Sequence, residues 1–100
     1  MVLEIYASSL CIDVLPKMNE IFRTLSEAEK YVEGRGGMLT VHIYIGTPEI
    51  VDIQVDYKGV EGVPDGGFGV ETDVGDFRAL HRDLERMLDE SFGPGWREVV

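Results

Sequence analysis

The side chains of this sequence that could do chemistry include two histidines, one cysteine and many carboxylates. His42 and Tyr44 alternate along one predicted strand, and Asp52 and Asp56 alternate along the next. If the strands pair, these side chains share one face of a sheet, where His42 could act as a general base with Asp52 or Glu4 as its partner. The same face could instead bind a partner, because tyrosines often anchor interfaces. It could also be an ordinary solvated face of an antiparallel sheet.

The glycine-rich segment 59–76 holds a second group of carboxylates. Between residues 60 and 76 the sequence has five acidic residues and no Lys or Arg, while the whole chain has a net charge of −10. Such a segment is either a solvated connection or a contact surface that steers a cationic partner. We predict that these acids bind the partner together with Phe68 as an apolar anchor and with residues of the strand face. The predicted partner-binding residues are Glu61, Asp65, Phe68, Glu71, Asp73, Asp76, Tyr44, Asp52 and Asp56.

No residue spacing in the sequence matches a complete metal or cofactor motif. Residues 66–71 resemble half of a calcium-binding nonapeptide repeat, but that structure needs several stacked turns. The ligand spacing of an EF-hand is missing, residues 34–37 lack the spacing of a phosphate loop, and the histidines lack metal-ligand spacing. Cys11 is the only cysteine, so an intramolecular disulfide is excluded and a small buried hydrophobe is predicted. We therefore expect no cofactor and no metal.

Length, charge and hydropathy limit the class of protein. A chain of 100 residues is the size of one domain, predicted here to span residues 1–100. The net charge of −10 argues against direct binding to nucleic acid or to anionic membranes. No apolar run approaches the roughly 18 residues of a membrane span, and no basic segment precedes an apolar one at the N-terminus. We therefore expect a cytoplasmic protein with a basic macromolecule, most simply a protein, as its partner.

The first third of the chain predicts a strand and one or two helices. Residues 2–8 alternate as a half-buried strand does. Residues 10–25 fit a helix capped by Asp13, although residues 20–24 could form a short strand. Ser26 and Glu29 have the form of a capping box, which predicts a helix near 27–34 that ends at the glycines following it.

The rest of the chain predicts a hairpin, a short strand and a final helix. Residues 39–45 and 51–57 alternate strictly, and matching their apolar faces pairs Ile43 with Ile53. A short strand at 68–72 follows, and then a helix capped by Asp73 or Asp76 whose apolar residues include Leu84. On that helix His81 is expected at the edge of the core. Residues 96–100 could add an edge strand.

Arginines recur every four residues along the final helix. Pairing at i+3 or i+4 with the nearby acids would leave this face simply solvated, and binding of phosphate or carboxylate is the alternative. The residues concerned are Arg78, Arg82, Arg86, Glu85, Asp89 and Glu90.

The order of elements predicts an α+β fold, in which a small and mostly antiparallel sheet carries two or three helices on one face as a two-layer sandwich. The leading functional hypothesis is a small acidic non-catalytic protein that occludes or regulates a basic partner surface, such as an inhibitor, an immunity-type protein or a nucleic-acid mimic. The alternative is a small enzyme or ligand-binding domain with a pocket around His42 and Tyr44. A third hypothesis is an assembly component in which an edge strand mediates a homodimer.

Overall fold

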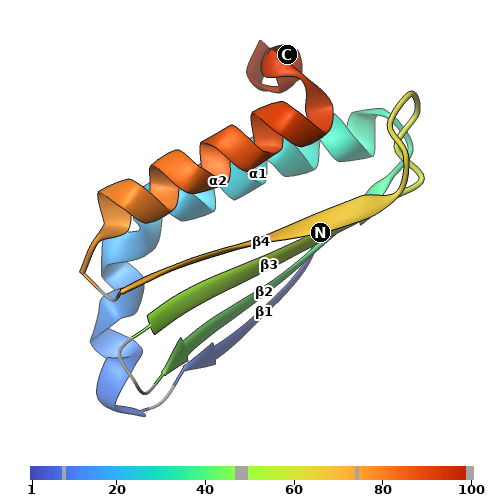
Figure 1. Ribbon diagram of the computed structural model, residues 1–100. Coiled ribbons are helices and arrows are strands. Elements are labelled where there is room, and N and C mark those ends of the chain that lie inside the picture. Colours follow the sequence, from blue (N-terminus) through green and yellow to red (C-terminus); the bar gives the residue numbers. More distant parts are fainter. Residues whose placement is uncertain (8, 47–49, 74, 99–100) are drawn as a thin grey trace.

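The sheet has four strands, and its order in space follows the order in the chain. The computed structural model describes residues 1–7, 9–46, 50–73 and 75–98. Strand β1 (Val2–Ala7) runs parallel to β2 (Met38–Gly46), while β3 (Ile50–Lys58) and β4 (Gly66–Asp73) each run antiparallel to the preceding strand. Figure 1 shows this sheet in a single layer with β1 and β4 at its two edges.

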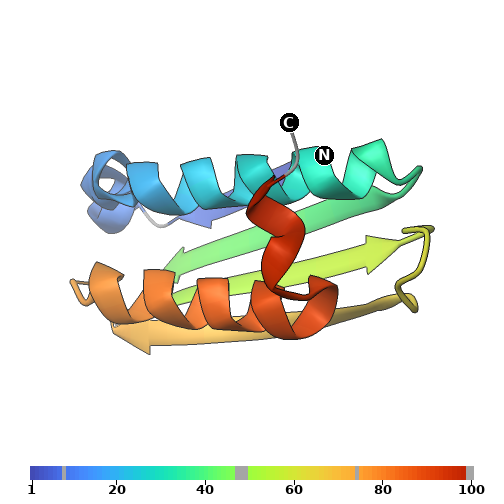
Figure 2. The same cartoon turned by 90° about the horizontal axis from the view of Figure 1, so that it is seen from above.

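The helices form the second layer. A 3-10 helix, η1 (Ser9–Met18), leads directly into α1 (Asn19–Gly34), and α2 (Phe77–Phe92) is followed by a short 3-10 helix, η2 (Pro94–Glu98). Figures 1 and 2 show α1 and α2 side by side on the same face of the sheet, with η2 lying across them. The predicted two-layer α+β sandwich is therefore confirmed. None of the helices within the described ranges is long and apolar enough to span a membrane.

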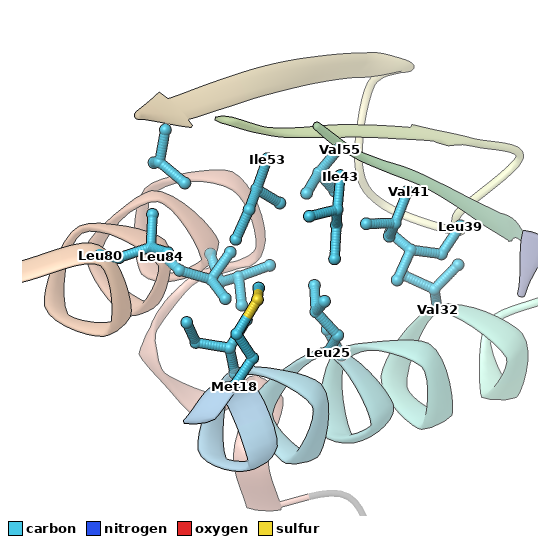
Figure 3. Close-up of a cluster of buried hydrophobic side chains, with 14 of the residues drawn as sticks. Met18, Leu25, Val32, Leu39, Val41, Ile43, Ile53, Val55, Leu80 and Leu84 are labelled. Atoms are coloured by element: carbon cyan, nitrogen blue, oxygen red, sulfur yellow. The ribbon is translucent and has the colours of Figure 1, made fainter. Parts of the chain in front are cut away.

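A single core fills the space between the two layers. Every second residue of β2 and β3 points inward, because side chains alternate across a strand. Figure 3 shows Ile43 and Ile53 from the sheet facing Leu25 of α1 and Leu84 of α2. These four side chains are at most 1 % exposed, so the helices and the hairpin are stabilised by the same buried cluster.

The hairpin has the predicted register. Ile43 lies opposite Ile53, Tyr44 opposite Asp52, and Ile45 opposite Val51. Slipping one strand by a single residue would turn its apolar side chains outward, so burial of one face determines the pairing. The predicted turn residues 47–49 lie outside the described part of the chain.

Helix α1 differs from the prediction in its boundaries. The sequence predicts a new helix after a capping box at Ser26, but α1 runs without a break from Asn19 to Gly34. Ser26 is exposed in mid-helix, while the buried residues Ile21, Leu25 and Val32 follow one another at helical spacing on both sides of it. Burial of this continuous stripe outweighs the local capping pattern. The alternative strand at 20–24 is also excluded.

The acidic segment is more ordered than its glycines suggest. The short strand predicted at 68–72 extends over residues 66–73, so Glu71 and Asp73 belong to the sheet and not to a loop. Of the two predicted caps, it is Asp76 that caps α2, because its carboxylate accepts a hydrogen bond from the amide of Ala79 at 3.2 Å.

The C-terminal segment corrects another prediction. Instead of an edge strand, residues 94–98 form η2, and Trp96 is fully buried. The indole Nε1 donates a hydrogen bond to the Asp89 carboxylate at 2.7 Å. Burial of a large aromatic side chain over the helix pair outweighs the weak strand preference of five residues. Residues 99–100 of the predicted strand lie outside the described residues.

Candidate functional site

The helices leave one face of the sheet uncovered, and we call it the open face (Figure 1). Because side chains alternate along each strand, the registers determine which residues belong to it. These are Val2, Glu4 and Tyr6 of β1, Met38, Thr40, His42, Tyr44 and Gly46 of β2, Ile50, Asp52, Gln54, Asp56 and Lys58 of β3, and Gly67, Gly69, Glu71 and Asp73 of β4.

Aromatic side chains gather on the β1–β2 half of the open face. The rings of Tyr6 and Tyr44 are stacked, with centroids 5.2 Å apart and an angle of 12° between their planes. The His42 ring lies 6.4 Å from each of them. Tyr6 is 50 % exposed and Tyr44 is 44 % exposed, so the pair presents apolar ring surface and polar hydroxyl groups to solvent.

Glu4 links the members of this aromatic group. Its carboxylate accepts a hydrogen bond from the Tyr6 hydroxyl and lies 3.5 Å from Nε2 of His42. The bond to Glu4 raises the pKa of the Tyr6 phenol above its ordinary value of 10.0, because the carboxylate binds the protonated phenol and repels the phenolate.

We expect the alkaline titration of Tyr6 to depend on Glu4. Since the pKa is raised, the Tyr6–Glu4 bond is fully present below pH 10.0 and is lost as the pH rises through the raised value. Replacing Glu4→Gln removes the negative charge, so the Tyr6 phenol should ionise at a lower pH. The pH midpoint of Tyr6 ionisation is measured by phenolate absorbance, as the difference between each protein and its Tyr6→Phe counterpart. Identical midpoints with and without Glu4 would contradict the contact.

Carboxylates occupy the β3–β4 half of the open face. Tyr44 lies opposite Asp52, which lies opposite Glu71, so one row across the sheet passes from tyrosine to two neighbouring acids. Gln54 donates a hydrogen bond to Asp52 at 2.7 Å. A side chain at Gly69 would begin 2.6 Å from Nε2 of Gln54, so the absence of a side chain there lets Gln54 lie over β4.

The basic side chains lie almost entirely in the helix layer. Of the nine lysines and arginines of the chain, Lys58 is the one that lies in a strand. The others lie in the helices or directly at their ends, at Lys17, Arg23, Lys30, Arg35, Arg78, Arg82, Arg86 and Arg97. The open face therefore combines Glu4, Asp52, Asp56, Glu71 and Asp73 with the single lysine, whereas the helix layer carries both signs.

The structure brings together some of the predicted partner-binding residues. Tyr44, Asp52, Asp56, Glu71 and Asp73 share the open face. Glu4 and Tyr6 extend it because β1 lies beside β2, an adjacency that the alternation of residues 2–8 allows but does not require.

The other predicted residues lie elsewhere. Phe68 points to the inner face and packs against the core. The Asp65 carboxylate accepts a hydrogen bond from the amide of Gly59 at 2.9 Å and so closes the β3–β4 connection. Asp76 is the cap of α2, and Glu61 is exposed in the same connection as Asp65. These four residues are not part of one surface with the tyrosines.

The pocket expected for an enzyme around His42 and Tyr44 is not among the hollows that stand out on the described residues. One of these hollows, of about 670 Å³, lies between the helices and includes His81 and Arg78 in its lining. A second hollow lies at the C-terminal end of α1. A third, of about 230 Å³, lies on the open face and is lined by Met38, Thr40, Asp56 and Lys58 together with Tyr57, and neither of the two includes His42 or Tyr44 in its lining. The part of the chain that the structure describes also holds no cluster of three potential metal ligands.

His81 of α2 contacts α1, and two of the helix's arginines lie near an acid of the same helix. His81 joins the two helices, because its Nε2 lies 2.8 Å from the hydroxyl of Thr24, as expected for a residue at the core edge. Arg82 and Arg86 each lie 3.8 Å from Asp83, and not beside the acids predicted to pair with them. Glu85 contacts Arg97 instead.

In comparisons with protein families, with curated proteins and with solved structures, no match to this chain is found.

Proposed function

We propose that this protein is a non-catalytic binding protein whose open face docks on a basic surface of a partner macromolecule and occludes it. The observation that carries the proposal is that the open face has five carboxylates and a single lysine, whereas the helix layer carries both signs. The open face presents carboxylates beside two exposed tyrosines, while all lysines and arginines except Lys58 belong to the helix layer and its ends.

The two halves of the open face would have different tasks in such a complex. The stacked pair of Tyr6 and Tyr44 is pre-ordered, so little side-chain freedom is lost when it packs against a partner. Asp52 lies directly beside Tyr44, and Glu71 lies beside Asp52 on the next strand. Carboxylates arranged in this way steer a cationic partner and orient it on the surface, and salt weakens the effect.

The class of partner follows from the same charges. A surface rich in carboxylates repels the phosphates of nucleic acids, so the partner is proposed to be a basic protein. Inhibitors, immunity-type proteins and nucleic-acid mimics act in this way. We place the protein in the cytoplasm, on the support of its single cysteine and the reducing conditions that keep such thiols free.

Neutralising acids of the open face should weaken binding of a basic partner. As a probe we choose a lysine- and arginine-rich peptide that contains aromatic residues, with affinity measured by calorimetry. The triple variant Asp52→Asn, Glu71→Gln and Asp73→Asn should bind about tenfold more weakly, since each exposed charge pair contributes about 0.5 kcal/mol. Raising the salt to about 1 M should reduce the affinity of the unmodified protein, because the Debye length falls to about 3 Å.

A matched control separates a local effect from net charge. The triple variant Glu20→Gln, Glu27→Gln and Glu90→Gln removes the same three charges from the helix layer. It should bind the peptide within about twofold of the unmodified protein, because exposed charges more than a Debye length away are screened. Equal losses for the two triple variants would mean that net charge alone attracts the peptide, and the proposal would be wrong.

A further inference from the structure

The edge strand β1 is exposed on both of its faces. Val2 and Tyr6 on the open face are 43 % and 50 % exposed. Leu3 and Ile5 point to the inner side, where the helices should cover them, but they remain 39 % and 38 % exposed. Figure 1 shows β1 as the strand farthest from the helices. A strip of apolar side chains thus accompanies the free backbone edge of the sheet.

The two edges of the sheet are built differently. Soluble proteins usually protect edge strands with charges, proline, glycine or bulges, because unpaired N–H and C=O groups invite another strand. The other edge, β4, has Gly66, Gly67, Glu71 and Asp73. Glu4 is the single charge on β1, which has the sequence Val-Leu-Glu-Ile-Tyr-Ala and no glycine or proline.

We propose that the free edge of β1 pairs antiparallel with β1 of a second copy of this chain, around a two-fold axis at Ile5. The inference does not depend on the proposed function. Pairing of the two β1 strands joins the two sheets into one, places both open faces on the same side, and covers Leu3 and Ile5 on the other side. The acidic β4 strands then lie at the outermost edges of the joined sheet, as far from each other as the fold allows.

The register follows from face matching and charge. Opposed residues of antiparallel strands point to the same face. A two-fold axis perpendicular to the sheet must therefore pass midway between one residue of β1 and the same residue of the second copy. An axis at Glu4 sets two carboxylates opposite each other, which is unfavourable. An axis at Leu3 sets Val2 opposite the Glu4 carboxylate and leaves Tyr6 unpaired.

An axis at Ile5 avoids both conflicts. It sets the two Ile5 side chains against each other and places Glu4 opposite Tyr6 of the second copy. The Tyr6 hydroxyl already donates to Glu4 within one strand, so the same two groups fit each other across the pair. Because β1 supplies both members of each favourable contact, its complement is another β1, which is why we favour a second copy over an unrelated strand.

The oligomeric state tests the pairing. Light scattering after size exclusion, from low to high micromolar protein, should reach twice the 11.2 kDa of one copy. In Ile5→Lys two lysines would face each other across the axis, so the dissociation constant should rise by at least about tenfold. Thr72→Lys, a matched control on the inner face of β4, should leave it unchanged. A monomer at every concentration, or a dimer lost through Thr72→Lys and not Ile5→Lys, would overturn the proposal.

The register is tested by cross-linking. In a Cys11→Ser background, Ile5→Cys should form an intermolecular disulfide on mild oxidation, because opposed residues of antiparallel strands lie within disulfide reach. Leu3→Cys and Glu4→Cys, the matched controls for the other two registers, should cross-link much more slowly. Faster cross-linking at either control position would overturn the axis at Ile5.

Discussion

Replacing Trp96→Ala should lower the free energy of unfolding by about 3–5 kcal/mol, as for other buried aromatic truncations. Trp96 is fully buried and belongs to η2, which lies across α1 and α2 (Figure 2). The truncation would also leave the Asp89 carboxylate without the hydrogen bond that it accepts from the indole N–H. For a small domain with a stability of about 5–15 kcal/mol this is a large fraction.

Urea unfolding followed by circular dichroism measures the Trp96 effect, since the substitution removes the only tryptophan and with it the fluorescence signal. Trp96→Phe is the control that keeps an aromatic ring and loses the hydrogen bond, which contributes about 1 kcal/mol. Trp96→Phe should therefore lower the free energy of unfolding by less than Trp96→Ala does. If alanine costs less than about 1 kcal/mol, the burial of Trp96 described here is incorrect.

Leu84→Ala should cost about 2–5 kcal/mol, because it opens a cavity at the centre of the core. Leu84 is fully buried, as are Leu80 and Leu88 one turn away on either side, and Figure 3 shows it pointing into the cluster toward the sheet.

Arg82→Ala on the same helix is the control for Leu84. The Arg82 side chain is 77 % exposed, so its truncation should change the stability by no more than about 0.5 kcal/mol. Both values come from the same urea titrations. Comparable losses for the two variants would show that the buried face of α2 has been wrongly assigned.

Alternation and helical spacing made several elements predictable. The hairpin register could be derived because Ile43 and Ile53 lie in strands whose every second residue is apolar, and a slip would expose them all. The face of α2 could be derived because Leu80, Leu84 and Leu88 repeat at intervals of four residues. The predicted two-layer α+β fold then follows from a sheet with one apolar face and helices with one apolar stripe.

Local signals failed where long-range burial outweighs them. The capping pattern at Ser26 is ordinary, but Leu25 and Ala28 beside it are both buried, and breaking the helix there would expose them. Trp96 belongs to a five-residue segment that is too short for any periodicity to show that it packs against the helices.

The candidate site was only partly predictable for a topological reason. Tyr44 and Asp52 could be placed on one face because they belong to the hairpin. Glu4 and Tyr6 join that face because β1 pairs in parallel with β2 after crossing over through α1, and single-strand patterns do not specify a neighbour. The sequence predicts Phe68 on the partner-binding surface, but alternation along β4 turns it inward beside Val55.

The central claim is that the open face is the binding surface, and mapping the contact residues by nuclear magnetic resonance tests it most directly. The isotope-labelled protein is titrated with the basic peptide, and the shift of each backbone amide is followed. We predict that the largest shifts fall on β1, β2 and the β3–β4 pair, around Tyr6, Tyr44, Asp52 and Glu71, and that salt suppresses them. Shifts that centre on the acids of α1 and α2, with the open face unaffected, would contradict the account.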